Sequence, residues 1–122
     1  AFNVIVTTLF YIVDRSGRLF QYVSCLDRAW HAGVSSYEGR ENCNDFSIGV
    51  ELEGTDSAPY EQAQYEKLGR LTDALAEAYP IKYVTGHSMI APLRKTDPGP
   101  AFDWLTYESL CTTGKPLCFP YV

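Results

Sequence analysis

The chain has 122 residues and a formal net charge of −5. Hydrophobic residues make up 46% of it and charged residues 20%, which is the composition of one ordinary globular domain. The acidic balance argues against binding to nucleic-acid phosphates, which requires clustered lysine and arginine, and no apolar run is long enough to span a membrane.

The N-terminal segment predicts a β-hairpin. Residues 2–13 (FNVIVTTLFYIV) are rich in β-branched and aromatic side chains, as in a buried strand. Residues 14–17 (DRSG) have the composition of a turn, and residues 19–23 alternate apolar and polar side chains. We therefore expect the two strands to pair with each other.

Residues 24–45 follow no regular pattern, and long ordered loops in small domains are often functional. Trp30 and His31 stand here next to Ala32 and Gly33. A tryptophan and a histidine on such a loop suit recognition of a sugar or an acyl group. A partly buried aromatic anchor with a hydrogen-bonded histidine explains them as well.

The second half of the chain predicts two strands and two helices. Residues 47–52 and 82–85 are short apolar strands, and residues 88–100 form a proline-rich loop. A helix is expected over residues 60–79, with Pro59 in its first turn and Pro80 after its end. A shorter helix is expected over residues 102–110. Apolar side chains spaced by three or four form one stripe of the long helix: Tyr65, Leu68, Leu71, Leu75 and Ala78. This order of elements indicates an α/β domain.

The most informative segment is residues 85–100, TGHSMIAPLRKTDPGP. His87 stands at the end of the predicted strand, and Asp97 follows in a Pro-Gly turn. Imidazole nitrogen and carboxylate oxygen are both zinc ligands, and catalytic zinc sites use three protein ligands. Taken alone, the pair is better explained as a surface histidine and a helix-capping aspartate.

Two further groups suit such a site. Lys95 precedes Asp97 by two residues, so an extended chain would place both on one side, where a lysine can stabilise an oxyanion. Glu51 and Glu53 would share one face of their strand, and a carboxylate there can act as a general base. A solvated surface lysine explains Lys95 better when it is taken alone, and an outward-facing acidic pair explains the glutamates equally well.

Two long stretches of the chain resemble one known family. They are RAWHAGVSSYEGRENCNDFSIGVELEGTD and TGHSMIAPLRKTDPGPAFDW. In this order they are similar to the N-acetylmuramoyl-L-alanine amidases of the peptidoglycan-recognition superfamily, above all to its cytoplasmic Gram-negative members that act on 1,6-anhydro-muramyl peptides. The resemblance runs from about residue 17 to residue 110. It implies a single α/β domain with a central mixed β-sheet flanked by helices.

The resemblance also implies roles for the residues of the second stretch and for Glu51. His87 and Asp97 match two of the family's three zinc ligands. Glu51 matches the glutamate that activates the attacking water, and Lys95 matches the lysine that stabilises the tetrahedral intermediate. Arg94 matches a basic residue that helps to bind the acidic stem peptide.

Trp30 and His31 belong, by the same resemblance, to a segment beside the substrate groove. The ends of the chain depart from the family pattern. The family's first zinc ligand is a histidine at the end of an N-terminal strand, but no histidine precedes His31, and Thr7 would be a poor replacement. Asn42 replaces an arginine. We expect residues 1–122 to form one amidase-like domain that is truncated or divergent at its N-terminus, with a divergent tail over residues 111–122.

The predicted function is a zinc-dependent amidase that hydrolyses the amide between (anhydro-)N-acetylmuramic acid and the L-alanine of muropeptides. Its cofactor would be Zn²⁺ and its partner a muropeptide. It would work as a monomer in peptidoglycan recycling in the bacterial cytoplasm, without nucleic acid or membrane. Two alternatives remain: a non-catalytic muropeptide-binding module, and an inactive fragment that lacks the first ligand histidine.

Overall fold

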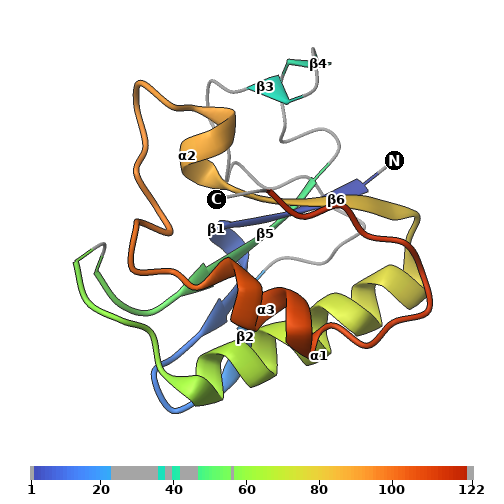
Figure 1. Ribbon diagram of the computed structural model, residues 1–122, viewed down its shortest axis with the longest axis horizontal. Helices are drawn as coiled ribbons and strands as arrows, with labels where there is room; N and C mark the ends of the chain where they lie inside the picture. Colours follow the sequence, from blue (N-terminus) through green and yellow to red (C-terminus); the bar gives the residue numbers. More distant parts are fainter. Residues whose placement is uncertain (1, 23–35, 38–39, 42–46, 56, 121–122) are drawn as a thin grey trace.

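The computed structural model describes residues 2–22, 36–37, 40–41, 47–55 and 57–120 (Figure 1). Along these residues, five strands are followed by one helix, a sixth strand and two further helices. The strands are β1 Phe2–Val13, β2 Leu19–Gln21, β3 Ser36–Tyr37, β4 Arg40–Glu41, β5 Ser47–Leu52 and β6 Ile81–Gly86. The helices are α1 Gln62–Ala78, α2 His87–Ile90 and α3 Trp104–Leu110.

The main sheet is built around β1, which pairs differently at its two ends. Residues 2–6 run parallel to both β5 and β6. After a shift of register, residues 11–13 remain parallel to β5 and pair antiparallel with β2. The four-stranded sheet is therefore mixed, and the predicted α/β class is confirmed. A separate antiparallel pair is formed by β3 and β4.

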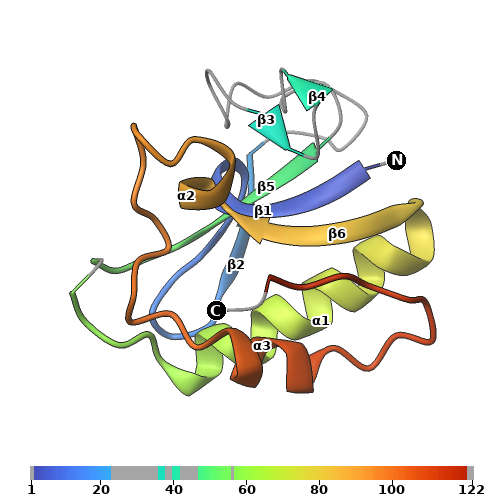
Figure 2. The same cartoon turned by 45° about the horizontal axis from the view of Figure 1, so that its top comes forward.

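The helices α1 and α3 lie side by side on one face of this sheet, and α2 continues from the end of β6 (Figures 1 and 2). Between α1 and α3, the hydroxyl groups of Thr72 and Tyr107 are 2.6 Å apart and both side chains are buried. Four of the five residues of the predicted stripe are buried as expected: Tyr65, Leu68, Leu71 and Leu75. The fifth, Ala78, is exposed because it is the last helical residue, and Ala76 is buried instead.

Several predicted elements need correction. The hairpin of β1 and β2 is confirmed, but all three residues of β2 are exposed, so its alternating pattern creates no buried face. The helix expected from residue 60 begins at Gln62, because Glu61 is its N-cap and the backbone N–H of Glu61 donates to the Gln64 side chain. The loop expected over residues 88–100 starts with α2.

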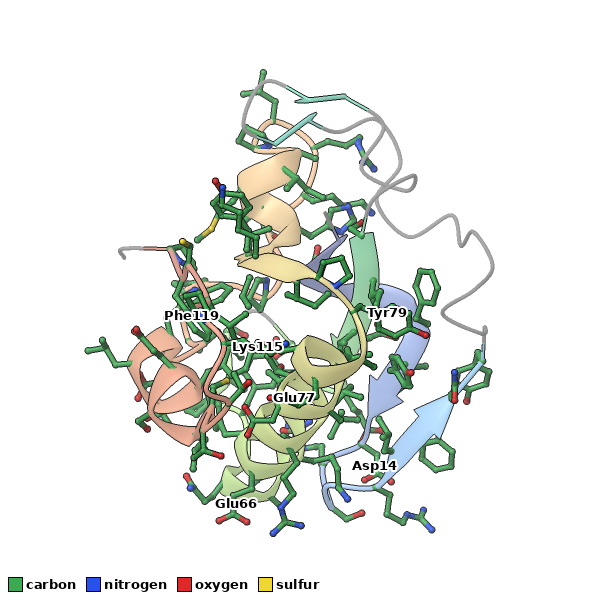
Figure 3. The ribbon with its side chains drawn as sticks, turned by 90° about the vertical axis from the view of Figure 1, so that its right-hand side faces the viewer. Asp14, Glu66, Glu77, Tyr79, Lys115 and Phe119 are labelled. Carbon is green, nitrogen blue, oxygen red and sulfur yellow. The ribbon has the colours of Figure 1, made fainter. Side chains whose placement is uncertain are left out.

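The predicted divergent tail packs on the domain over residues 111–120. Asp73 of α1 accepts hydrogen bonds from the backbone N–H groups of Thr112 and Thr113, and Glu77 accepts one from the Thr113 hydroxyl. Figure 3 shows Glu77 beside the stretch that carries Lys115. Further along, Cys118 pairs with the backbone of β6 through two hydrogen bonds of 2.9 Å. The tail therefore covers one edge of the main sheet.

Candidate active site

The register of the sheet brings the ends of β5 and β6 to one level. Val6 of β1 pairs with Val50 of β5 on one side and with Gly86 of β6 on the other. Glu51 follows Val50 in β5, and His87 follows Gly86 at the end of β6. The two residues therefore lie toward the same end of the sheet, two strand spacings, or roughly 9–10 Å, apart. The carboxyl ends of parallel strands are a common place for active sites, because loops open from them.

His87 and Asp97 meet at this edge, as the resemblance implied. The Nδ1 atom of His87 lies 3.2 Å from an Oδ atom of Asp97. The histidine side chain is only 6% exposed, whereas the aspartate side chain is 37% exposed. Packing therefore holds the imidazole, while the carboxylate depends on the turn that carries it.

That turn, residues 96–99, is attached to α2 and closed on itself. The N–H of Ser88 donates to the carbonyl of Asp97 at 2.9 Å, and the N–H of Gly99 donates to the carbonyl of Thr96 at 2.9 Å. Gly99 has a φ of +84°, in the region that favours glycine. The Pro-Gly turn predicted after Asp97 is thus present.

The end of β6 touches the same turn. A Cβ atom added to Gly86 would lie 2.7 Å from Cδ of Pro98 and 3.3 Å from the ring of Trp104. Only a residue without a side chain leaves room for Pro98 there. The glycine before His87 therefore allows the turn that carries Asp97 to approach the strand end.

Glu51 completes the cluster. It pairs with Ile12 of β1 in the sheet, and its side chain is partly buried. Burial raises the pKa of Glu51 above its usual 4.5, and the negative charge of Asp97 raises it further. Because the charge of Asp97 acts on Glu51, the two carboxylates lie in one electrostatic neighbourhood. Glu53 does not share this site, since its carboxylate accepts from the backbone N–H of Arg15 at 2.9 Å.

The expected placement of Lys95 on the same side as Asp97 stays a prediction. The N–H groups of Arg94 and Lys95 both donate to the carbonyl of Ala91, at 3.0 and 2.9 Å, so the chain turns just before Lys95. Both basic residues are exposed on the loop between α2 and Asp97. Trp30, His31 and Asn42 lie outside the described residues.

Tyr60 contacts the turn that carries Asp97 and was not predicted from the sequence. Its hydroxyl donates to the carbonyl of Pro98 at 2.9 Å, directly after Asp97. A tyrosine just before an amphipathic helix has the pattern of an ordinary core residue, so no sequence signal distinguishes it. A hollow of about 400 Å³ also borders this turn and is lined by Thr96 and Trp104 among others, but none of the predicted site residues that the structure describes lines it.

The geometry of the His87–Asp97 pair suits a zinc ion. Ligand atoms about 2.0–2.2 Å from a tetrahedral zinc ion lie roughly 3.3–3.5 Å from one another. The 3.2 Å between Nδ1 of His87 and Oδ2 of Asp97 is close to that separation. The pair fits two corners of such a site. Among the described residues, no three His, Cys, Asp or Glu side chains gather in a way that could hold a metal ion.

The N-terminal strand nevertheless reaches the site. Val6 of β1 pairs with Gly86, the residue before His87, and Thr7 follows Val6 within β1. The resemblance places a histidine ligand at the end of an N-terminal strand, whereas β1 continues to Val13. The chain contains only one histidine besides His87, namely His31.

Comparison with known proteins identifies the family to which the chain is similar. The sequence profile of the family described as N-acetylmuramoyl-L-alanine amidase matches residues 7–100. The 1,6-anhydro-N-acetylmuramyl-L-alanine amidase AmpD of Enterobacter cloacae is 60% identical over 106 residues, which are 85% of this chain and 57% of that protein.

Solved structures give the same result. The crystal structure of a selenomethionine derivative of AmpD superposes with a TM-score of 0.82 at 54% identity, over 87% of this chain and 60% of that one. AmiD of E. coli, in complex with the substrate anhydro-N-acetylmuramic acid-L-Ala-D-γ-Glu-L-Lys, has a TM-score of 0.80 at 32% identity, over 88% and 56% of the two chains. The chain spans little more than half the length of the curated relatives it matches.

Proposed function

Because the chain belongs to the N-acetylmuramoyl-L-alanine amidase family, we propose that it hydrolyses the amide between the lactyl group of (anhydro-)N-acetylmuramic acid and the L-alanine of a muropeptide. The observation that carries the proposal is the 3.2 Å contact between His87 and Asp97 beyond the end of β6, at the end of the sheet where β5 carries Glu51. The complex of AmiD with an anhydro-muramyl peptide supports the choice of substrate class.

Glu51 is the proposed general base. Its raised pKa brings the carboxylate closer to the pH of the cell, where a base is most effective. It takes a proton from the attacking water as the water oxygen bonds to the amide carbon. The proton then passes to the amide nitrogen as the C–N bond breaks. The products are a free peptide amine and a lactyl carboxylate.

The basic residues of the loop before Asp97 are proposed to interact with negative charges of the substrate and of the reaction intermediate. The ammonium group of Lys95 would stabilise the oxyanion that forms when the amide carbon becomes tetrahedral. The guanidinium group of Arg94 would pair with a carboxylate of the stem peptide. Both side chains are exposed and so accessible to a substrate. Trp30 and His31 are proposed to contact the substrate as well.

Zinc is the proposed cofactor, with His87 and Asp97 as two of its ligands. When bound, the ion would supply Lewis-acid polarisation of the scissile carbonyl. Two protein ligands would bind zinc more weakly than the three of an ordinary catalytic site. The zinc content of the purified chain is therefore the first quantity to measure.

The test combines product release with metal content. The purified chain, supplied with zinc and an anhydro-muramyl peptide, should release the free peptide. Asp97→Ala should lose bound zinc by native mass spectrometry and lose hydrolysis, whereas Glu66→Ala, an exposed carboxylate of α1, should retain both. No release by the unaltered chain at high concentration would refute the activity. Unchanged zinc content in Asp97→Ala would refute the metal site.

A second candidate is a non-catalytic module that binds muropeptides. It is supported by the two-residue ligand set, since the described residues offer no third histidine or carboxylate beside His87 and Asp97. Calorimetry would then detect muropeptide binding without hydrolysis, with or without zinc. A chain that neither binds nor hydrolyses the peptide would instead be an inactive fragment.

The proposed setting is peptidoglycan recycling in the bacterial cytoplasm, by a monomer that uses neither nucleic acid nor a membrane. The net charge of −5 supports the proposal that the protein does not use nucleic acid. In the part of the chain that the structure describes, no helix has the length and apolar character needed to cross a bilayer. Sedimentation of the purified chain would test the monomer, and fractionation of cells that express it would test the compartment.

A further inference from the structure

We propose that Tyr60 is a positioning residue whose hydroxyl holds the turn that carries Asp97 beside His87. The inference deepens the proposed function, because the position of Asp97 matters chemically only if the site binds metal. Tyr60 is 38 residues away from the turn in sequence, and its hydroxyl donates to the carbonyl of Pro98 at 2.9 Å. It therefore connects the start of α1 with the residue directly after Asp97.

The tyrosine ring is itself held in place. It packs edge-on against Phe102, with ring centroids 5.7 Å apart, and against Tyr65, with centroids 6.5 Å apart. Arg15 contacts the residues on both sides of it: its guanidinium donates to the backbone carbonyl of Pro59 at 3.2 Å and pairs with the side-chain carboxylate of Glu61 at 2.9 Å. A donor fixed at ring and backbone can restrain its acceptor.

The two ligands differ in what holds them. His87 is buried, with a side chain 6% exposed, so packing determines its position. Asp97 is 37% exposed, and the contacts of its turn determine where the carboxylate lies. Those contacts include the hydrogen bond from Ser88, the close approach of Gly86 to Pro98, the hydrogen bond from Phe102 to the Gly99 carbonyl at 3.2 Å, and the hydrogen bond from Tyr60. Of these four, the contact from Tyr60 comes from the residue most distant in sequence.

The consequence is that removing one hydroxyl should loosen Asp97 without moving His87. If the Pro98 carbonyl is released, the turn opens more often and the Ser88–Asp97 hydrogen bond breaks more often. The ring contacts remain in Tyr60→Phe, so the domain still folds. The effect should appear in local opening of the turn and in metal affinity, because groups that orient metal ligands change the affinity of the site.

The experiment compares Tyr60→Phe with Tyr65→Phe. Tyr65 belongs to the same aromatic cluster, and its hydroxyl accepts from the N–H of Asp103 at 2.8 Å, so Tyr65→Phe loses a similar hydrogen bond at the start of α3. Amide hydrogen exchange is measured by NMR in the metal-free protein. In Tyr60→Phe the amides of Ser88 and Gly99 should exchange about fivefold faster, the factor expected for one neutral hydrogen bond. In Tyr65→Phe they should not change.

Zinc titration by calorimetry is the second readout. Tyr60→Phe should bind zinc about tenfold more weakly, and Tyr65→Phe should match the unaltered chain. The role of Tyr60 would be overturned if the Ser88 amide exchanged at the same rate in Tyr60→Phe as in the unaltered chain. It would also be overturned if Tyr65→Phe accelerated this exchange as much as Tyr60→Phe does. If the unaltered chain binds no zinc, the proposed metal function fails, while the exchange comparison still decides whether Tyr60 holds the turn.

Discussion

Two irregular segments pack on the same scaffold but are held in different ways. The turn over residues 96–99 is held near one point, by Tyr60, Gly86 and Ser88, and these contacts bring one carboxylate to one imidazole. The tail over residues 111–120 is held at two distant places, by Asp73 at its start and by the backbone of β6 near its end.

The difference separates a turn that positions a candidate site residue from a tail that covers one edge of the sheet. Contacts gathered at one point determine the position of a side chain, as a ligand site requires. Contacts spread along a segment instead occupy unpaired backbone groups at a sheet edge, which would otherwise be open to other chains. The family profile matches residues 7–100, so it includes the turn and excludes the tail. Changes in the turn should therefore affect activity first, and changes in the tail should affect stability first.

The largest effect is expected from Glu51→Gln at the edge of the site. Loss of the proposed general base should lower the rate of peptide release by about 10²–10⁴-fold. The fold should be retained, because a partly buried carboxylate with a raised pKa is replaced by a neutral group of the same shape. Release assays and thermal unfolding would be measured together. Glu53→Gln is the matched control, since it lies two residues away and bonds Arg15 instead. Similar losses in both variants would contradict the assignment.

Next in size is Gly86→Ala, which tests the close approach of β6 to the turn. The new methyl group would lie 2.7 Å from Pro98, so the turn must shift, at a cost of about 1–3 kcal/mol in the free energy of unfolding. Zinc affinity and hydrolysis should fall with it. Gly114→Ala is the control in the tail, because nothing lies within 4 Å of a Cβ at that position. Urea denaturation would measure both, and equal stability of the two variants would contradict the packing argument.

A smaller effect is expected from Asp73→Ala, which removes the acceptor at the start of the tail. Asp73 accepts from the N–H groups of Thr112 and Thr113 and from the Thr112 hydroxyl. Its loss should cost about 1 kcal/mol of stability and speed hydrogen exchange of the Thr112 and Thr113 amides, while the rate of hydrolysis stays unchanged. If hydrolysis fell as strongly as in Gly86→Ala, the separation between turn and tail would be wrong.

The smallest change concerns the pH dependence of hydrolysis. Burial, and then the charge of Asp97, raise the pKa of Glu51 above its usual 4.5. As the pH falls, Glu51 is therefore protonated, and lost as a base, at a higher pH than an ordinary glutamate. The acid limb of kcat/KM should have its midpoint above pH 4.5. A rate that stays constant down to pH 4.5 would show that another group limits the reaction.

The fold could be predicted to a large extent because its signals are local. The composition of residues 2–13 and the helical stripe of α1 each depend on a few neighbouring residues, and both elements are present. The errors lie at element ends, where distant contacts decide the outcome. Helix α1 starts later than expected because Arg15, in the turn between β1 and β2, donates to the carbonyl of Pro59. In addition, the backbone N–H of the N-cap residue Glu61 donates to the side chain of Gln64. The exposed β2 has the pattern of a half-buried strand, but among the described strands it pairs with β1 alone.

The sequence by itself determined which residues could perform the chemistry. The order of Glu51, His87, Lys95 and Asp97 within two motifs was sufficient to indicate the family, since motif order is a property of the chain alone. Only the tertiary structure decided that His87 and Asp97 approach to 3.2 Å, and that Tyr60 contacts the turn that carries Asp97. The physical reason is that parallel strand register and a glycine-sized gap at Gly86 bring together residues that local propensity cannot relate.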